Sequence, residues 1–286
     1  MGEATDIAKQ FKGTFDTLHA LVYFVPETDQ YLSAVGLRPG RMCYFAGRSA
    51  PMGAVGPDVV AATFYNFNPE IITRHLPRAW TLATPEAVVA ARFEAVDATY
   101  RRLLGEEVLA SEDLAEAVEL VREAAGGCEV EGRALYAGHA GLAWPEQPHV
   151  ALWHGITLLR EHRGDAHVAA LMLNGLSGLG ALVTHVATGA GFTPEDAKKT
   201  RGWSDEQWDG AVAELAGQGL LDADGGLTDR GTELRERVEA ATNAASEGPW
   251  ARLGEEKSAR LRELCRPLSR TVAKAGVFPR PPAARS

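Results

Sequence analysis

Apolar positions along the chain recur mainly at helical spacing, and the strict alternation that is typical of strands is scarce. Thr84 and Pro85 open the segment 84–104, whose apolar stripe ends before Gly105. This pattern predicts a capped amphipathic helix. The same start signals and spacing predict further helices over 111–125, 149–162, 165–175, 177–188, 193–200, 204–219 and 229–245. A helix end is expected at Gly164, with Asp165 capping the next helix.

One two-stranded hairpin is predicted within this helical chain. Leu220 and Leu221 precede an acidic, glycine-rich turn at Gly225 and Gly226, and Leu227 follows it. Such a turn between short apolar segments is typical of a tight hairpin. Over 193–245 the predicted order is therefore a short helix, a turn, a longer helix, a hairpin and a long helix, which is the order of a winged helix-turn-helix.

The two halves of the chain share an order of motifs that suggests an internal duplication. Residues 67–70 (FNPE) are followed by Trp80, and residues 192–195 (FTPE) are followed by Trp203. A capped helix comes next in each half, over 84–104 or 204–219. Chance agreement among helices rich in Ala and Leu is the alternative. The duplication predicts two degenerate winged-helix units, of which the first has lost its wing.

The segment 212–242 (VAELAGQGLLDADGGLTDRGTELRERVEAAT) resembles the wing region of the MarR family of bacterial regulators. The expected fold is mainly α, with two degenerate MarR-like winged-helix units and one small β-hairpin wing in the C-terminal half. The expected division is 1–147 for the first unit, 148–250 for the second, and 251–286 for a basic helix with a tail rich in Pro and Arg. Because MarR proteins are dimers, a duplicated chain is expected to be a monomer that imitates the dimer, or a homodimer.

Composition and charge narrow the classes of function. The 286 residues are 45% hydrophobic and 23% charged, with a formal net charge of −9, which is typical of a globular protein and disfavours nucleic acid as a partner. The three cysteines are far apart and form no zinc or disulfide pattern, which indicates a reducing compartment. Without an apolar signal segment or an apolar run of membrane-spanning length, a cytoplasmic protein is expected.

The predicted DNA-reading helix carries the wrong charge for its role. Residues 193–245 contain six basic and twelve acidic side chains. Sequence-specific DNA binding is therefore not expected. If the chain does bind DNA, the cluster of Lys198, Lys199 and Arg201 and the basic tail are the candidates. Residues 251–286 hold nine Lys and Arg against three Glu.

The densest candidate chemistry lies at 149–167, which holds four of the eight histidines. A helix end explains part of this segment, but it does not explain all of its aromatic and polar residues. The residues 44–53 add Tyr, Arg, Gly and Pro in a mixture that suits a ligand contact. The predicted ligand-binding residues are Tyr44, Arg48, Tyr65, Trp153, His154, Arg160, His162 and His167. Aromatic rings would stack on the ligand and arginine would hold an anionic group.

No cofactor is expected, and the enzyme hypothesis has little support. The chain has no dinucleotide, phosphate-loop, zinc-protease or nucleophile-elbow motif. A haem or a metal on the 149–167 histidines remains an alternative, although the spacing of His154 and His162 does not place both on one helix face. No metal site is therefore assigned.

Five further stretches make the chain look like an actinobacterial family of helix-turn-helix proteins of poorly known function. They are 44–55 (YFAGRSAPMGAV), 152–171 (LWHGITLLREHRGDAHVAAL), 173–189 (LNGLSGLGALVTHVATG), 192–208 (FTPEDAKKTRGWSDEQW) and 224–231 (DGGLTDRG). The resemblance implies the fold and no catalytic residue. The first hypothesis is a sensor or sequestering protein for a small aromatic or anionic molecule. The alternatives are a MarR-like transcriptional regulator and an enzyme or haem protein.

Overall fold

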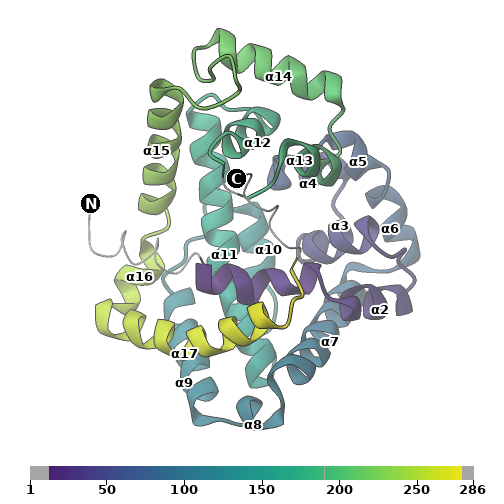
Figure 1. Cartoon of the computed structure of the whole chain (residues 1–286). Coiled ribbons are helices and arrows are strands. Elements are labelled where there is room, and N and C mark those ends of the chain that lie inside the picture. The colour runs from purple at the N-terminus through teal and green to yellow at the C-terminus, as the bar shows by residue number, and fades with distance from the viewer. Residues whose placement is uncertain (1–12, 190, 279–286) are drawn as a thin grey trace. The chain divides into compact units, whose positions relative to one another are not determined.

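The computed structural model describes residues 13–189 and 191–278, and its regular structure is almost entirely helical (Figure 1). Two compact units can be distinguished, each assembled from separate stretches of the chain. The described part of unit 1 is 13–55, 78–166 and 243–278, and that of unit 2 lies within 56–77 and 167–242. The sequence-based segments 1–147, 148–250 and 251–286 are continuous instead, and this division stays a prediction.

Unit 1 is an assembly of helices around one large apolar core. After a helical stretch at 13–20, its elements are η1 (Leu21–Tyr23), α2 (Pro26–Ala34), α3 (Arg41–Ser49), η2 (Ala50–Met52), α7 (Pro85–Leu104), α8 (Glu106–Leu109), α9 (Glu112–Ala125), α10 (Ala134–Ala140), α16 (Gly248–Leu253) and α17 (Glu255–Lys274). Two more helices, α6 (Leu76–Leu82) and α11 (Pro148–Leu173), have residues in both units. Leu18, Tyr100 and Trp153 are buried at the centre of the unit 1 core.

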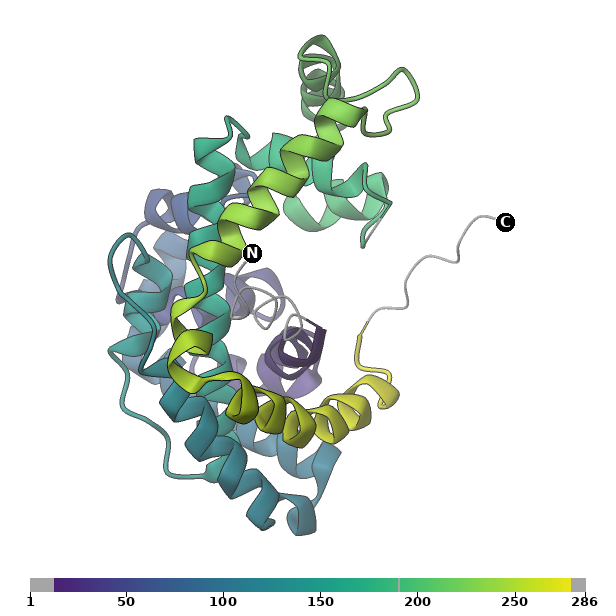
Figure 2. The same cartoon turned by 90° about the vertical axis from the view of Figure 1, so that its left-hand side faces the viewer.

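The C-terminal helix α17 belongs to this core. Its apolar side chains Leu261, Leu264, Leu268 and Val272 follow helical spacing and are buried in the same cluster as residues of α9, beside which α17 runs (Figure 2). The Pro/Arg-rich end predicted after this helix, residues 279–286, lies outside the described residues.

Unit 2 contains α4 (Pro57–Phe64), α5 (Pro69–Thr73), α12 (Gly178–Val186), α13 (Pro194–Arg201), α14 (Asp205–Gly217) and most of α15 (Asp229–Ala244). Leu182, Trp208, Leu215 and Val238 pack in its core. Gly178 begins α12 where a β-carbon would lie only 1.9 Å from the Tyr65 carbonyl oxygen, so the backbone approach requires glycine.

Three of the helix starts predicted from sequence, at Thr84, Ser111 and Ser204, are confirmed by side-chain caps. Thr84 accepts a hydrogen bond from the Ala87 amide at 3.3 Å, and Ser111 accepts one from the Leu114 amide at 3.2 Å. Ser204 and Gln207 form a reciprocal capping box at the start of α14. Short polar side chains therefore satisfy amide groups that each helix leaves unpaired at its first turn.

The predicted helix break at Gly164 is wrong, because α11 continues through it to Leu173. Gly164 can be accommodated inside a long helix that is held by packing. Asp165 does act as a cap, but for another helix: its Oδ2 accepts a hydrogen bond from the amide of Tyr136, in the first turn of α10, at 2.9 Å. Capping by a residue 29 positions away in sequence is not visible in a local pattern.

The predicted β-hairpin is also corrected. In the described residues it is reduced to one isolated antiparallel bridge between Leu221 and Leu227, and no sheet forms. The Asp222 side chain accepts hydrogen bonds from the amides of Asp224 and Gly226, both at 2.9 Å, and so closes the turn. Thr228 then already caps α15 through the Gly231 amide. The local hydrogen bonds of Asp222 and Thr228 thus take up amide groups on both sides of the bridge.

Within 13–189 and 191–278, no helix by itself has the length and apolar composition to cross a membrane, although the bent pair α11 and α12 passes that test jointly.

Candidate functional site

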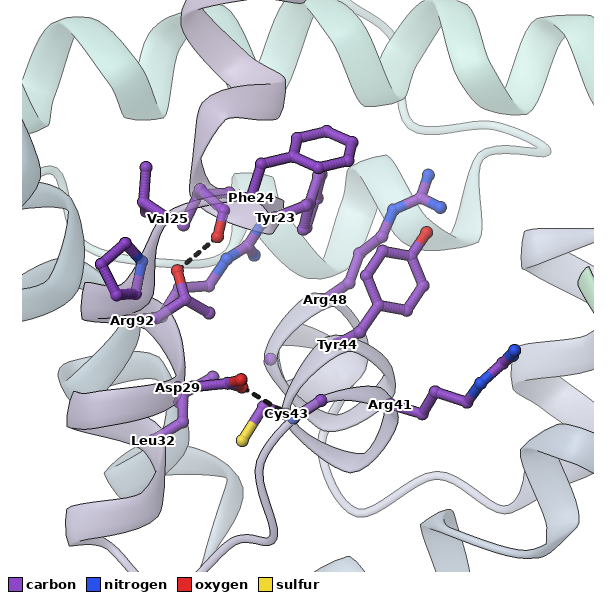
Figure 3. Close-up of a pocket in the computed structure, with 15 residues that line it drawn as sticks. Tyr23, Phe24, Val25, Asp29, Leu32, Arg41, Cys43, Tyr44, Arg48 and Arg92 are labelled. Atoms are coloured by element: carbon purple, nitrogen blue, oxygen red, sulfur yellow. Dashed lines mark hydrogen bonds between the residues drawn. The ribbon is translucent and has the colours of Figure 1, made fainter. Parts of the chain in front are cut away.

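A cavity of about 510 Å³ lies in unit 1 among η1, α2, α3 and α7 (Figure 3). Its wall mixes apolar side chains with three arginines and two tyrosines. The lining residues are Val22, Tyr23, Phe24, Val25, Pro26, Thr28, Asp29, Leu32, Gly40, Arg41, Cys43, Tyr44, Gly47, Arg48 and Arg92. A volume of this size and a wall of this kind are typical of small-molecule sites.

Local sequence explains how α3 presents its polar residues to the cavity. Gly40 adopts a φ of 80° before the helix, and its amide donates to Asp29 Oδ1 of α2 at 2.8 Å. The contact fixes the start of α3 against α2. Tyr44 and Arg48 then follow one helical turn apart on the same face. Both therefore reach the cavity, where Figure 3 shows their polar ends close together.

Arg48 is held in place by a carboxylate on α11. Its Nε donates to Glu161 Oε1 at 3.0 Å and its Nη2 donates to Glu161 Oε2 at 2.8 Å. Arg160 Nη1 adds a third hydrogen bond to Glu161 Oε2 at 2.9 Å. Glu161 is completely buried. Burial alone would raise its pKa, but Arg48 and Arg160 more than offset that effect and hold the pKa well below its ordinary value.

Arg92 of α7 lines the same cavity but has a different environment. It is only 4% exposed, and no carboxylate of the described residues forms an ion pair with it. Its Nη1 donates to His139 Nε2 and its Nη2 donates to Tyr23 Oη, both at 3.1 Å. The guanidinium also lies over the Trp153 ring, with its carbon 4.8 Å from the ring centroid. Its contacts are thus with groups that carry no negative charge.

The histidines beside Arg92 are neutral, and their hydrogen bonds assign the tautomers. Arg92 donates to His139 Nε2, so His139 Nδ1 carries the proton that is donated to the Leu135 carbonyl at 2.9 Å. Burial and then the charge of Arg92 lower the pKa of His139 to about 3. His19 Nδ1 lies 3.1 Å from Thr157 Oγ1, whose proton goes to the Trp153 carbonyl. His19 therefore donates from Nδ1.

A directed hydrogen-bond chain follows from these tautomers. Arg92 donates to Tyr23 Oη, and Tyr23 donates to His19 Nε2 at 3.2 Å. His19 then donates to Thr157. The rings of His19 and Trp153 stack with centroids 6.0 Å apart and planes at 5°. The polar end of the cavity is thus held in one arrangement by groups on four helical segments.

The structure brings four of the eight predicted ligand residues to one region. Tyr44 and Arg48 line the cavity, and Arg160 binds the same Glu161 as Arg48. Trp153 packs under Arg92 and donates from Nε1 to the His19 carbonyl at 3.2 Å. These positions agree with a common site, but ligand contact by these residues stays a prediction.

His154 and His162 lie elsewhere in the interior of unit 1. Neither ring has a hydrogen-bond partner for its nitrogens within the described part of the chain. His154 contacts the edges or faces of Phe93 and Trp144, with centroids 5.8 and 5.0 Å away, and His162 contacts Tyr136. Burial is the main reason that the pKa of each falls to about 4. Both are neutral core residues in this arrangement.

Tyr65 and His167 belong to unit 2 and not to the unit that holds the cavity. Tyr65 has a positive φ of 58° after α4, and its hydroxyl donates to the Leu176 carbonyl. His167 Nδ1 lies 2.9 Å from Thr242 Oγ1. The histidines of 149–167 project from different faces of α11 and have different neighbours. They therefore do not form one cluster. No group of three or more metal-binding side chains is found among the described residues.

The helix-turn-helix segment of unit 2 consists of α13, a turn at 202–204 and α14. Gly202 has a φ of 78°, and a β-carbon there would lie 2.9 Å from Ile71 Cδ1, so both conformation and space require glycine. Asn68 holds the turn through Nδ2, which donates to the Gly202 carbonyl at 3.0 Å and to Gln207 Oε1 at 3.1 Å. Trp203 Nε1 donates to the Asn66 carbonyl at 2.9 Å.

The residues proposed for a DNA contact have intramolecular roles. Lys198 pairs with Asp205 at the start of α14. Arg201 lies over the rings of Phe67 and Phe192, with its guanidinium carbon 4.5 and 5.2 Å from their centroids. Lys199 also has an interaction within the protein. Helix α14 itself exposes four carboxylates, Asp205, Glu206, Asp209 and Glu214, and contains no lysine or arginine.

Sequence reasoning missed Tyr23, Arg92 and His19. A signal for one of them was present: Arg92 lies four residues after Val88 and four before Val96, on the stripe that α7 buries. A charged residue at such a position needs a partner or a function. For His19 and Tyr23, the sequence contains no comparable signal.

The comparisons with known proteins agree with the helical architecture. Residues 8–279 match a family described as a helix-turn-helix family. No curated protein and no solved structure shows significant similarity to the chain. Because the family match spans almost the whole sequence, the chain belongs to this helix-turn-helix family.

Proposed function

We propose that this protein binds a small molecule in the cavity of unit 1, as a sensor or a sequestering protein, and that it does not read DNA sequence. The observation that carries the proposal is the cavity of about 510 Å³ with Arg92, Tyr23 and Tyr44 on its wall. Known small-molecule pockets have volumes of about 300–1,000 Å³ and combine apolar walls with a few fixed polar groups.

The wall supports the proposal because its polar groups are held in place before any ligand arrives. Arg48 is fixed by Glu161, and Arg92 is fixed by His139 and Tyr23. A site with fixed side chains loses less conformational entropy when it binds. Phe24 is 45% exposed at the cavity and offers an apolar surface to the ligand.

We further propose that the scaffold arose by duplication of a winged-helix unit. Two similar motifs support this idea: Asn68 and Thr193 each cap a helix that begins with proline, Pro69 or Pro194. The single bridge at Leu221 and Leu227 occupies the place of the wing. The resemblance of 212–242 to MarR proteins points in the same direction.

The surface of α14 argues against sequence-specific DNA binding. In a helix-turn-helix protein the second helix of the motif enters the major groove. The exposed positions of α14 carry four carboxylates and no cation. Phosphate attraction supplies much of the affinity for DNA, so this helix would be repelled.

A search for a co-purifying ligand tests the binding proposal. The full chain is analysed by native mass spectrometry before and after denaturation, together with Thr28→Phe, whose ring would enter the cavity, and Thr73→Phe as an exposed control in unit 2. We expect a bound mass on the wild type and on Thr73→Phe but not on Thr28→Phe. Equal occupancy of all three proteins would place the ligand elsewhere.

The second candidate function is a MarR-like DNA-binding regulator, which the family match and the geometry of α13 and α14 favour. Fluorescence anisotropy with a random 30-base-pair duplex and with the DNA upstream of the gene distinguishes the two. We expect no binding to either duplex at 150 mM salt. Tight, sequence-dependent binding that Gln207→Ala weakens would replace the first candidate with the second.

A further inference from the structure

Two buried arginines, Arg48 and Arg92, lie on the cavity wall, and of these two only Arg48 has a carboxylate partner among the described residues. Arg48 and Arg160 bind the carboxylate of Glu161. Arg92 is almost as deeply buried as Glu161 and has no such partner within the described residues. We propose that Arg92 is the anchor for the carboxylate of a small organic acid with an apolar body. This inference rests on the proposed function and names the class of its ligand.

The contacts of Arg92 leave donors unused. A guanidinium group has five N–H donors, and the contacts of Arg92 are one hydrogen bond from Nη1 to His139 and one from Nη2 to Tyr23. Both partners are neutral, so they orient the group without compensating its charge. Transfer of a charge out of water is unfavourable unless an opposite charge accompanies it. A carboxylate in the cavity supplies that opposite charge and accepts from the unused donors.

The positive charge of Arg92 acts on the groups around it. After burial, it is the largest influence that lowers the pKa of His139 to about 3 and that of His154 to about 4. The pKa of His19 is lowered mainly by burial and by Arg160, and Arg92 and Arg48 add to this effect while Glu161 opposes it. A bound anion beside Arg92 would offset this influence, so the histidines report on the site from within the protein.

The charged and apolar residues that line the cavity beside Arg92 indicate which kind of acid would fit. The guanidinium of Arg92, which has no carboxylate partner among the described residues, suits the two oxygens of a carboxylate group, which it can bind through parallel hydrogen bonds. Arg41 extends away from Arg92 on the other side of Tyr44 (Figure 3), and Asp29 lies on the wall with its carboxylate bonded to the Gly40 amide. A second anionic group on the side of Asp29 would be repelled by its carboxylate. Phe24, Val25 and Leu32 give the wall an apolar surface that suits the apolar body of such an acid.

The test compares acids with their uncharged amides, which differ little in shape. The probes are benzoic, phenylacetic and indole-3-acetic acid with the three matched amides, and binding to the full chain at pH 7 is measured by titration with ligand-observed NMR. The variants are Arg92→Gln, Arg92→Lys and, as a control with the same change of charge on an exposed side chain of unit 1, Arg266→Gln. We expect at least a tenfold preference for the acids in the wild type and in Arg266→Gln. Arg92→Gln should lose that preference, and Arg92→Lys should retain part of it.

Other binding results would contradict the carboxylate anchor, its assignment to Arg92, or the proposed function. Acids and amides that bind equally well to the wild type would overturn the anchor and leave the proposed function intact. A preference for acids that survives in Arg92→Gln would overturn the assignment to Arg92. Failure of all six probes to bind at millimolar concentration would count against both proposals. If Arg92→Gln does not fold, NMR of the wild type at pH 7 decides: saturation with an acid, but not with its amide, should shift the guanidinium resonances of Arg92 and the ring nitrogen resonances of His139. Unchanged resonances would overturn the anchor.

Discussion

Arg48 and Glu161 form a two-point ion pair across 113 residues of sequence, with N–O distances of 3.0 and 2.8 Å and with Glu161 wholly shielded from water. The pair joins α3 to α11 and holds Arg48, which lines the cavity. Two parallel hydrogen bonds between a guanidinium and a carboxylate fix both groups in direction as well as distance. Arg48 is therefore held by a carboxylate of the protein itself, whereas the buried Arg92 has no carboxylate partner among the described residues and is the arginine proposed to bind the ligand.

Replacement of the carboxylate tests this division of roles. In Glu161→Gln, Arg48 and Arg160 lose their shared negative partner while the shape of the side chain is kept. Breaking a buried pair by neutralising one member leaves an uncompensated charge and costs about 3–5 kcal/mol. We expect a loss of this size in the free energy of unfolding, measured by urea denaturation at pH 7.

The control for that measurement is Glu106→Gln, which breaks the exposed pair between Arg101 and Glu106. Water screens this pair, so we expect little change in stability. If the two variants lose the same amount of stability, Glu161 does not act as a buried counter-ion for Arg48.

The lowered pKa values of the buried histidines predict that the folded protein loses stability in mild acid. The pKa is about 3 for His139 and about 4 for His154 and His162, below the ordinary 6.5. In the unfolded chain these groups take up protons as the pH falls below 6.5, whereas in the folded protein they do not. Their contribution is therefore complete above pH 6.5 and is lost toward the folded pKa values. Each histidine should remove about 1 kcal/mol between pH 7 and 5.5.

Asp165 opposes this trend in part. Burial raises its pKa from 3.8 to about 6, so the folded state binds its proton first and gains stability as the pH falls through 6.

Urea unfolding of the wild type and of His154→Leu at pH 7 and 5.5 measures the net loss of stability and the share of it that is due to His154. His154 has no hydrogen-bond partner for its ring, so His154→Leu should reduce the acid-induced loss by about 1 kcal/mol. An unchanged loss would mean that His154 is protonated in the folded protein.

The sequence predicted most of the helices and less of the site, for reasons that particular residues illustrate. Thr84, Ser111 and Ser204 each cap the helix that follows them, so a local pattern was sufficient. Asp165 also looked like a local cap, but its partner is the amide of Tyr136 in another helix. The interpretation of Gly164 as a helix end failed for the same reason: tertiary packing, which the local sequence does not encode, decides whether α11 continues.

The same limit applies to the cavity. Arg48 and Tyr44 were predicted because they share a short segment with unusual composition, and both line the cavity. Arg92 and Glu161 lie 44 and 113 residues after Arg48 in the sequence, and only the fold brings them near it. Nothing in the stretch 149–167 indicated that Glu161 is a buried counter-ion and that His154 is an isolated core residue.

Two glycines in unit 2 allow a matched test of backbone packing. A β-carbon on Gly178 would lie 1.9 Å from the Tyr65 carbonyl oxygen, whereas one on Gly210 of α14 would have no atom within 4 Å. We expect Gly178→Ala to destabilise the protein by about 1–3 kcal/mol, because the backbone must shift. Gly210→Ala should stabilise it by about 0.5–1 kcal/mol, because alanine loses less entropy in a helix. Thermal unfolding of both variants measures the difference, and equal midpoints would contradict the close approach.

Asn68 provides a test of how the helix-turn-helix is held. Its Oδ1 accepts a hydrogen bond from the Glu70 amide at 3.0 Å, and its Nδ2 donates to the Gly202 carbonyl and to Gln207 Oε1. In Asn68→Asp the cap of α5 is retained, but a carboxylate replaces the donor and faces two acceptor oxygens. We expect a loss of about 2–3 kcal/mol, since a buried acceptor is left unsatisfied. Hydrogen exchange should rise at the turn, 202–204, and at the first residues of α14, but not in α5. A loss confined to α5 would mean that Asn68 is only a local cap and that the turn is stabilised by other residues.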